Sequence, residues 1–211
     1  MRKVFKVILI VLGIIGALII GFYVFLYFAF DGLFFGPSYD KADLVKNYEN
    51  RKIQIMEVRD YYKSILPRDK SVYLEFGKGK KLEIFHLYGD SLNENNWNLE
   101  IGTPKVDSLL NELKWTNTEL KILREKLAAA NCISVAGTEP VNIGWQRSGM
   151  GLFSYDIFQH NLNTDQIKEY NDGCSYIFYK DNIVLEYGGG AIGIQCFPEF
   201  YHNKNKKQGS P

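Results

Sequence analysis

The chain opens with a continuous apolar segment. Residues 7–30, VILIVLGIIGALIIGFYVFLYFAF, carry no charged side chain. As an α-helix rising about 1.5 Å per residue, this segment is long enough for the roughly 30 Å hydrocarbon core of a bilayer. It shows none of the polar face expected of a soluble helix. The pattern predicts a transmembrane signal-anchor helix over residues 7–30, in contact with membrane lipid. The alternative, a cleaved signal peptide, has a shorter apolar region that ends at small residues, whereas this segment ends in bulky aromatic side chains.

Charged residues differ on the two sides of this segment. Arg2, Lys3 and Lys6 precede it, whereas Asp31 and Asp40 follow it. Because positive charge stays on the cytoplasmic side of a membrane, residues 1–6 are expected in the cytoplasm. The sequence therefore predicts a single-pass protein of the plasma membrane whose C-terminal domain is extracytoplasmic.

Small residues recur along one side of the apolar segment. Gly13, Ala17 and Gly21 are spaced four apart, which places them on one helix face and permits close helix–helix approach. Small residues are also common in membrane helices without such a role. A homodimer through Gly13, Ala17 and Gly21 is one interpretation of the pattern, and ordinary composition is the other.

After residue 31, helical and alternating patterns follow one another along the chain. Helices are predicted at 41–65, at 106–115, after the capping box Thr116-x-x-Glu119 and at 164–170. Strands are predicted at 72–76, 82–88, 99–101, 132–135, 141–145, 151–158, 176–179, 183–187 and 194–197, with 91–98 as a loop. Hairpins set apart from helices indicate an α+β fold with an antiparallel sheet and segregated helices. We expect this domain over residues 31–200, followed by a polar, disordered tail over residues 201–211.

Gly188, Gly190 and Gly193 match the G-x-G-x-x-G fingerprint of dinucleotide-binding proteins. That fingerprint needs a helix directly after the glycines and an acidic residue about 20 residues later. Pro198 lies too close for the helix, and the acidic position falls beyond residue 211. The glycines are better explained as a bend or close backbone approach, so no nucleotide and no cofactor is expected.

The acidic residues all follow the apolar segment, whereas Arg2, Lys3 and Lys6 precede it. The domain beyond the segment is therefore mildly acidic, which argues against binding to nucleic acid, since that activity needs a basic patch.

The three cysteines suggest one bridge. Cys174 and Cys196 bracket the last predicted hairpin and form the favoured pair, which leaves Cys132, although spacing alone does not fix the connectivity. A nucleophile assembled from Cys174, His160 and Asp156 is the alternative use of Cys174, but Cys174 suits a core position equally well.

No histidine has a second ligand at metal-binding spacing, so no metal site is predicted.

Carboxylates and aromatic residues occur throughout the predicted strands. Glu75, Glu83, Glu100 and Glu186 are interpreted as outward-facing, and no pair of carboxylates stands out for hydrolysis. Aromatic residues of the last third suit either cross-strand packing or a ligand face: Trp145, Tyr155, Tyr176, Tyr179 and Tyr187.

No motif is specific enough to name a family. The function predicted from the sequence is a non-enzymatic binding or interaction module that is held at the membrane and has a protein partner. The alternative is a membrane-tethered hydrolase with a site near the Gly188–Gly193 loop.

Overall fold

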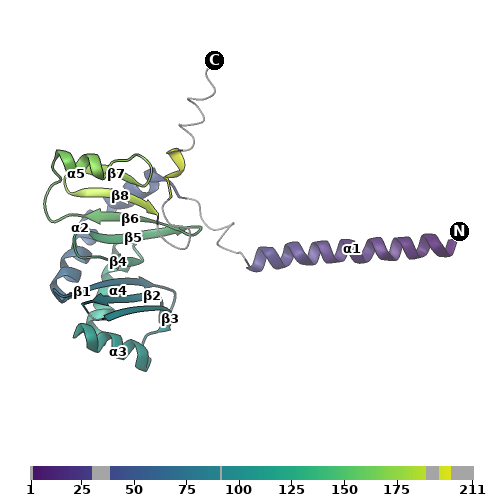
Figure 1. The fold of residues 1–211 in the computed structure, drawn as a ribbon, viewed down its shortest axis with the longest axis horizontal. Helices are drawn as coiled ribbons and strands as arrows, with labels where there is room; N and C mark the ends of the chain where they lie inside the picture. Colours follow the sequence, from purple (N-terminus) through teal and green to yellow (C-terminus); the bar gives the residue numbers. More distant parts are fainter. Residues whose placement is uncertain (1, 30–38, 91, 189–194, 201–211) are drawn as a thin grey trace, which may run out of the picture.

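The computed structural model describes residues 2–29, 39–90, 92–188 and 195–200. Its helices are α1 (Arg2–Ala29), α2 (Lys41–Ile65), α3 (Pro104–Leu113), α4 (Asn117–Ala129) and α5 (Thr164–Glu169). Its strands are β1 (Lys70–Phe76), β2 (Lys81–Gly89), β3 (Leu92–Glu100), β4 (Ser134–Ala136), β5 (Val141–Ser148), β6 (Gly151–Ile157), β7 (Tyr176–Lys180) and β8 (Ile183–Gly188). Figure 1 shows α1 apart from the sheet.

The eight strands form one sheet in the order β3-β2-β1-β4-β5-β6-β8-β7 (Figure 1). Every neighbouring pair is antiparallel. Most neighbours in space are also neighbours in sequence, as expected where short turns join antiparallel strands. The α+β fold with an antiparallel sheet is therefore confirmed, and so is the helix predicted at 41–65. The helix predicted from the Thr116 capping box is confirmed with both capping hydrogen bonds present.

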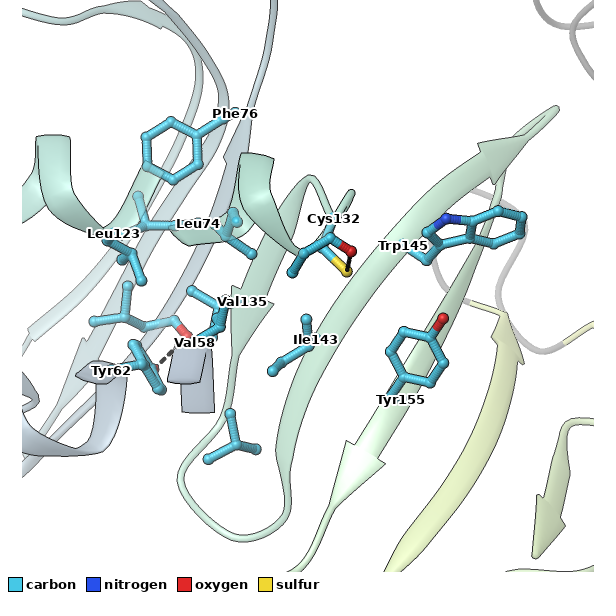
Figure 2. Close-up of a cluster of buried hydrophobic side chains, with 14 of the residues drawn as sticks. Val58, Tyr62, Leu74, Phe76, Leu123, Cys132, Val135, Ile143, Trp145 and Tyr155 are labelled. Atoms are coloured by element: carbon cyan, nitrogen blue, oxygen red, sulfur yellow. Dashed lines mark hydrogen bonds between the residues drawn. The ribbon is translucent and has the colours of Figure 1, made fainter. Parts of the chain in front are cut away.

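Helices α2 and α4 pack together over one face of the sheet, and the main core lies between. On β6, Phe153, Tyr155 and Ile157 point to this side, and the Tyr155 Oη atom donates to the backbone oxygen of Leu44 in α2 at 2.9 Å. Figure 2 shows side chains from α2, α4 and the central strands meeting in this core. Because side chains alternate along a strand, the residues between these three lie on the opposite face.

Strand β5 contains an irregularity that matters for the opposite face. Its register with β6 shifts between Gly144 and Gln146, so that Trp145 is an extra residue. Trp145 is buried in the main core, whereas Arg147 pairs with Leu152 on the other side of the sheet. The bulge therefore moves Arg147 onto the face that α2 and α4 do not cover, which we call the open face.

Two strand predictions are wrong. Residues 92–98, predicted as a loop, belong to the edge strand β3, because cross-strand pairing with β2 overrides the weak strand propensity of a segment rich in asparagine. The final strand predicted at 194–197 is absent from its described part, residues 195–197. That segment is fixed instead by hydrogen bonds with the residues just before β7, including one from Phe197 N to the backbone oxygen of Cys174 at 2.8 Å.

The N-terminal apolar segment does form a helix, α1. Across the residues that the structure describes, however, none of the helices has the combined length and apolarity that a membrane crossing requires. This finding overturns the transmembrane signal-anchor predicted over residues 7–30, and with it the single-pass plasma-membrane localisation and the extracytoplasmic placement of the domain. The prediction rests on the length, apolarity and flanking charges of this segment, and such features do not by themselves fix what a helix packs against. Residues 30–38 and the whole of the predicted tail, residues 201–211, lie outside the described residues.

Candidate functional site

Polar residues gather on the open face where β5, β6 and β8 lie side by side. Asn142 of β5 is opposite Asp156 of β6, and Ser154 of β6 is opposite Glu186 of β8. Each of these residues alternates with an apolar residue of the main core, so the strand periodicity directs all four side chains away from α2. The sheet therefore assembles a polar cluster from three separate strands.

A shared hydrogen-bond donor connects the members of this cluster. The Nδ2 atom of Asn142 lies 2.8 Å from Asp156 Oδ1, 2.6 Å from Glu186 Oε2 and 3.0 Å from Ser154 Oγ. The Ser154 hydroxyl donates to Glu186 Oε2 at 3.0 Å, and the Tyr176 hydroxyl donates to Glu186 Oε1 at 3.3 Å. The two carboxyl groups are therefore close neighbours, joined through one amide nitrogen.

Burial changes the acidity of Asp156. Asp156 is only 5% exposed, and desolvation, followed by the adjacent negative charge of Glu186, raises its pKa to about 7, although the Asn142 hydrogen bond opposes the shift. Two carboxyl groups so close together resist double ionisation. Near neutral pH, Asp156 is therefore protonated in a large fraction of the molecules.

The carboxyl pair lies in a pocket of about 390 Å³ on the open face. Three tyrosines line the pocket: Tyr73 from β1, Tyr170 at the end of α5 and Tyr176 from β7. Among the described residues that line it there are two carboxylic acids and no lysine, arginine or histidine. The pocket is therefore acidic at its base and aromatic at its sides.

A small second core holds two of the tyrosines in place. On the open face, Ile167 of α5 packs with Tyr170 and Tyr176 against a small buried cluster, which consists of Phe158, Leu162 and Val184. The rings of Tyr170 and Tyr176 meet edge to face, with centroids 5.6 Å apart. Burial, reinforced by the charge of Glu186, raises the pKa of Tyr176, which keeps its hydroxyl protonated as a donor.

The third tyrosine is held by a buried ion pair. Glu75 of β1 is 4% exposed and accepts two hydrogen bonds from Arg147, from Nε at 2.6 Å and from Nη2 at 2.5 Å. The Tyr73 hydroxyl donates to Glu75 Oε2 at 3.0 Å. Glu75 does face away from the main core, as predicted, since its neighbours Leu74 and Phe76 point into that core. It is nevertheless buried, because Arg147, redirected by the bulge, pairs with it on the open face.

A disulfide joins Cys174 to Cys196, the pair favoured from the sequence, with their Cα atoms 4.2 Å apart. Ser175 donates to the backbone oxygen of Gln195 at 3.0 Å, next to this bridge. The bridge therefore anchors the chain beyond β8 to the residues just before Tyr176, beside the pocket. A Cys174 nucleophile is excluded while this bond exists, and Cys132 is buried in the core with a raised pKa.

The other residues singled out from the sequence lie in different parts of the structure. On α1, Gly13, Ala17 and Gly21 are exposed, and a Cβ added at Gly13 or Gly21 would have no neighbour within 4 Å. Self-association through this face stays a prediction. Of the glycine fingerprint, Gly188 lines the pocket, whereas residues 189–194 lie outside the described residues. Within the described chain, no group of three candidate ligands is arranged to hold a metal ion.

The pocket was not predicted from the sequence, although Asp156 was considered there beside Cys174 and His160, and Glu186 was interpreted as outward-facing. In β6, Ser154 and Asp156 occupy alternate positions of a strand that is buried throughout. A charged residue in such a strand indicates that other groups compensate for its burial, because an unpaired buried charge is costly. Of the five aromatic residues considered as a ligand face, Tyr176 lines the pocket, whereas Trp145, Tyr155 and Tyr187 belong to the main core.

Comparison of the chain with protein-family models, curated proteins and solved structures gives no match.

Proposed function

We propose that this protein is a binding module, and that its ligand occupies the open-face pocket. The observation that carries the proposal is the buried carboxyl of Asp156 beside the half-buried carboxyl of Glu186 at the base of a tyrosine-lined pocket. Keeping two carboxyl groups together costs folding free energy, and groups with a perturbed pKa, such as Asp156, concentrate at functional sites. The volume of the pocket, about 390 Å³, lies within the range typical of small-molecule sites.

The geometry favours binding over catalysis. Both carboxyl groups already accept hydrogen bonds from Asn142, and Glu186 accepts two more from Ser154 and Tyr176. Such fixed groups are suited to holding a ligand in one orientation. In glycoside hydrolysis, by contrast, two carboxyl groups flank a bond placed between them, and here they converge on one amide nitrogen of the protein.

A ligand screen with a pocket-filling variant tests this proposal. We expect the full chain to bind members of a small-molecule library of mixed charge, detected by NMR. Ala136 of β4 lines the pocket, so Ala136→Tyr should abolish that binding by occupying the hollow. Ala128→Tyr, on the exposed surface of α4, is the matched control and should bind as the wild type does. Binding that survives Ala136→Tyr would place the ligand elsewhere and contradict the proposal.

A hydrolase using the same pocket is the second candidate. The observation that favours it is the pKa of Asp156, raised to about 7 beside a second carboxyl group, as in residues that act as general acids near neutral pH. Gly188, the first residue of the loop considered from the sequence, also lines this pocket. Turnover of chromogenic glycosides or esters by the wild type, abolished in Asp156→Asn, would favour this candidate over simple binding.

A further inference from the structure

The pocket has more hydrogen-bond acceptors than donors. The Asn142 amide carries two hydrogens, yet three oxygens lie within hydrogen-bond distance of its nitrogen. Asp156 Oδ1 is one of them, and within the described part of the chain no hydrogen bond reaches Asp156 Oδ2. A ligand that donates several hydrogen bonds would satisfy these oxygens, whereas one that only accepts would find few partners.

Charge narrows the ligand class further. The described lining contains Asp156 and Glu186 and no cationic side chain, so an anion would meet repulsion without compensation. Full ionisation of the pair is costly when the pocket holds no counter-charge. A cation placed against both carboxyl groups removes that cost, which a neutral hydroxyl compound of the same shape cannot do.

The walls of the pocket fit the same kind of ligand. Tyr73, Tyr170 and Tyr176 surround the acidic base, and aromatic rings attract cations through their negative faces. The rings also offer apolar surface to the carbon skeleton of a ligand, while its charged end reaches the carboxyl groups. Carboxylates at the base and aromatic rings at the sides together select an organic cation over a bare metal ion.

We propose that the open-face pocket binds a protonated amine, whose N–H groups donate to Asp156 and Glu186 and whose carbon skeleton contacts the tyrosine walls. The inference rests on the proposed binding function and specifies its ligand class. The amine has two possible sources, a free small molecule or the side chain of a lysine, and both present the same chemistry to the pocket.

Titration calorimetry of the full chain with matched probes tests the inference. Benzylammonium is compared with benzyl alcohol, its neutral counterpart, and with tetramethylammonium, which is a cation without N–H donors. We expect benzylammonium to bind roughly thirtyfold more tightly than either, as for a charged partner held by two close carboxylates, one of them buried. N-acetyl-lysine-N-methylamide serves as the lysine probe, and whether it or benzylammonium binds more tightly identifies the source. This comparison uses wild-type protein alone, so it does not depend on the folding of a variant.

Substitutions then locate the binding. Asp156→Asn and Glu186→Gln should each weaken benzylammonium binding by roughly thirtyfold, whereas Asp90→Asn, an exposed carboxyl in the β2–β3 turn, should not change it. Equal affinity for benzyl alcohol, or for tetramethylammonium, would overturn the inference while leaving a binding pocket in place. If Ala136→Tyr also fails to change any binding found in the library screen, the proposed function itself is contradicted.

Discussion

Asp156 and Glu186 each place one carboxyl oxygen on the same nitrogen, Nδ2 of Asn142, at 2.8 and 2.6 Å. This arrangement couples the ionisation of the two carboxyl groups, because a negative charge on one makes it harder to ionise the other. The sheet thus keeps a titratable pair on its open face, with consequences for stability and for binding that can be measured separately.

Stability should depend on pH through Asp156. Its pKa is raised to about 7 in the folded protein, whereas a carboxyl in the unfolded chain titrates near about 3.9. Between these values the folded state holds the extra proton, so the free energy of unfolding should fall as pH rises from about 4 to about 7, by a few kcal/mol. Asp156→Asn should remove most of this slope and be more stable than wild type at about pH 8, as measured by urea unfolding.

The exposed carboxyl of Asp90 supplies the control for this prediction. Asp90→Asn should keep the wild-type slope, because its side chain is solvated in the β2–β3 turn. An unchanged slope in Asp156→Asn would show that Asp156 is not the group responsible.

The affinity for benzylammonium should rise with pH. The titratable groups that line the described pocket with Asp156 are Glu186 on β8, Tyr73 on β1, Tyr170 after α5 and Tyr176 on β7, and none of them supplies positive charge. A bound cation favours the ionised pair, so below about pH 7 the affinity should increase by up to about tenfold per pH unit, and above it the curve should flatten. Calorimetry in phosphate and in HEPES, neither of which is a primary amine, should detect the released proton as a buffer-dependent heat. A pH-independent affinity would contradict this linkage, and Asp156→Asn should show a much smaller dependence.

Removal of Arg147 should leave a buried charge unpaired. Glu75 is 4% exposed and depends on the two hydrogen bonds from Arg147. Arg147→Met should therefore lower the free energy of unfolding by about 3 kcal/mol. Adding Glu75→Leu should restore much of this loss, because no charge is then left unpaired. Lys168→Met, which breaks an exposed pair with Asp165, should change the stability by less than about 0.5 kcal/mol.

The Cys174–Cys196 bridge should stabilise the protein and the pocket together. It closes a loop with a sequence separation of 22 residues, so Cys174→Ser combined with Cys196→Ser should cost about 3 kcal/mol. Since Tyr176 lies two residues from Cys174, benzylammonium binding should weaken as well. Peptide mapping by mass spectrometry without reduction should find the bridge directly. A reducing agent should destabilise wild type and leave the double variant unchanged, whereas an equal effect on both would exclude the bridge as the cause.

Local patterns predicted much of the fold, because periodicity reports which face of an element is buried. The capping box at Thr116 and the alternation in β1 and β2 each depend on residues near in sequence. Strand β3 was missed because its signal is not local: its asparagine-rich sequence acquires strand structure by pairing with β2. The N-terminal segment was predicted correctly as a helix, α1, but wrongly as a membrane span, because sequence features alone do not fix what a helix packs against.

The site could not be assembled from the sequence for a geometric reason. Asn142, Asp156 and Glu186 come from three strands, and Asn142 and Glu186 are 44 residues apart along the chain. Their contact follows from strand order and register, which spacing does not determine. The available signal was weaker: a carboxyl group within the apolar pattern of β6 indicates that something must compensate for its burial.

The bulge at Trp145 makes the length of β5 more important than its exact composition. Before the bulge, Val141, Ile143 and Trp145 point into the main core, and after it Arg147 lies on the open face. Loss or gain of a single residue here would exchange the two faces of the strand end, directing a guanidinium group into apolar packing and leaving Glu75 without its partner. This part of the chain should therefore tolerate point substitutions far better than insertions or deletions.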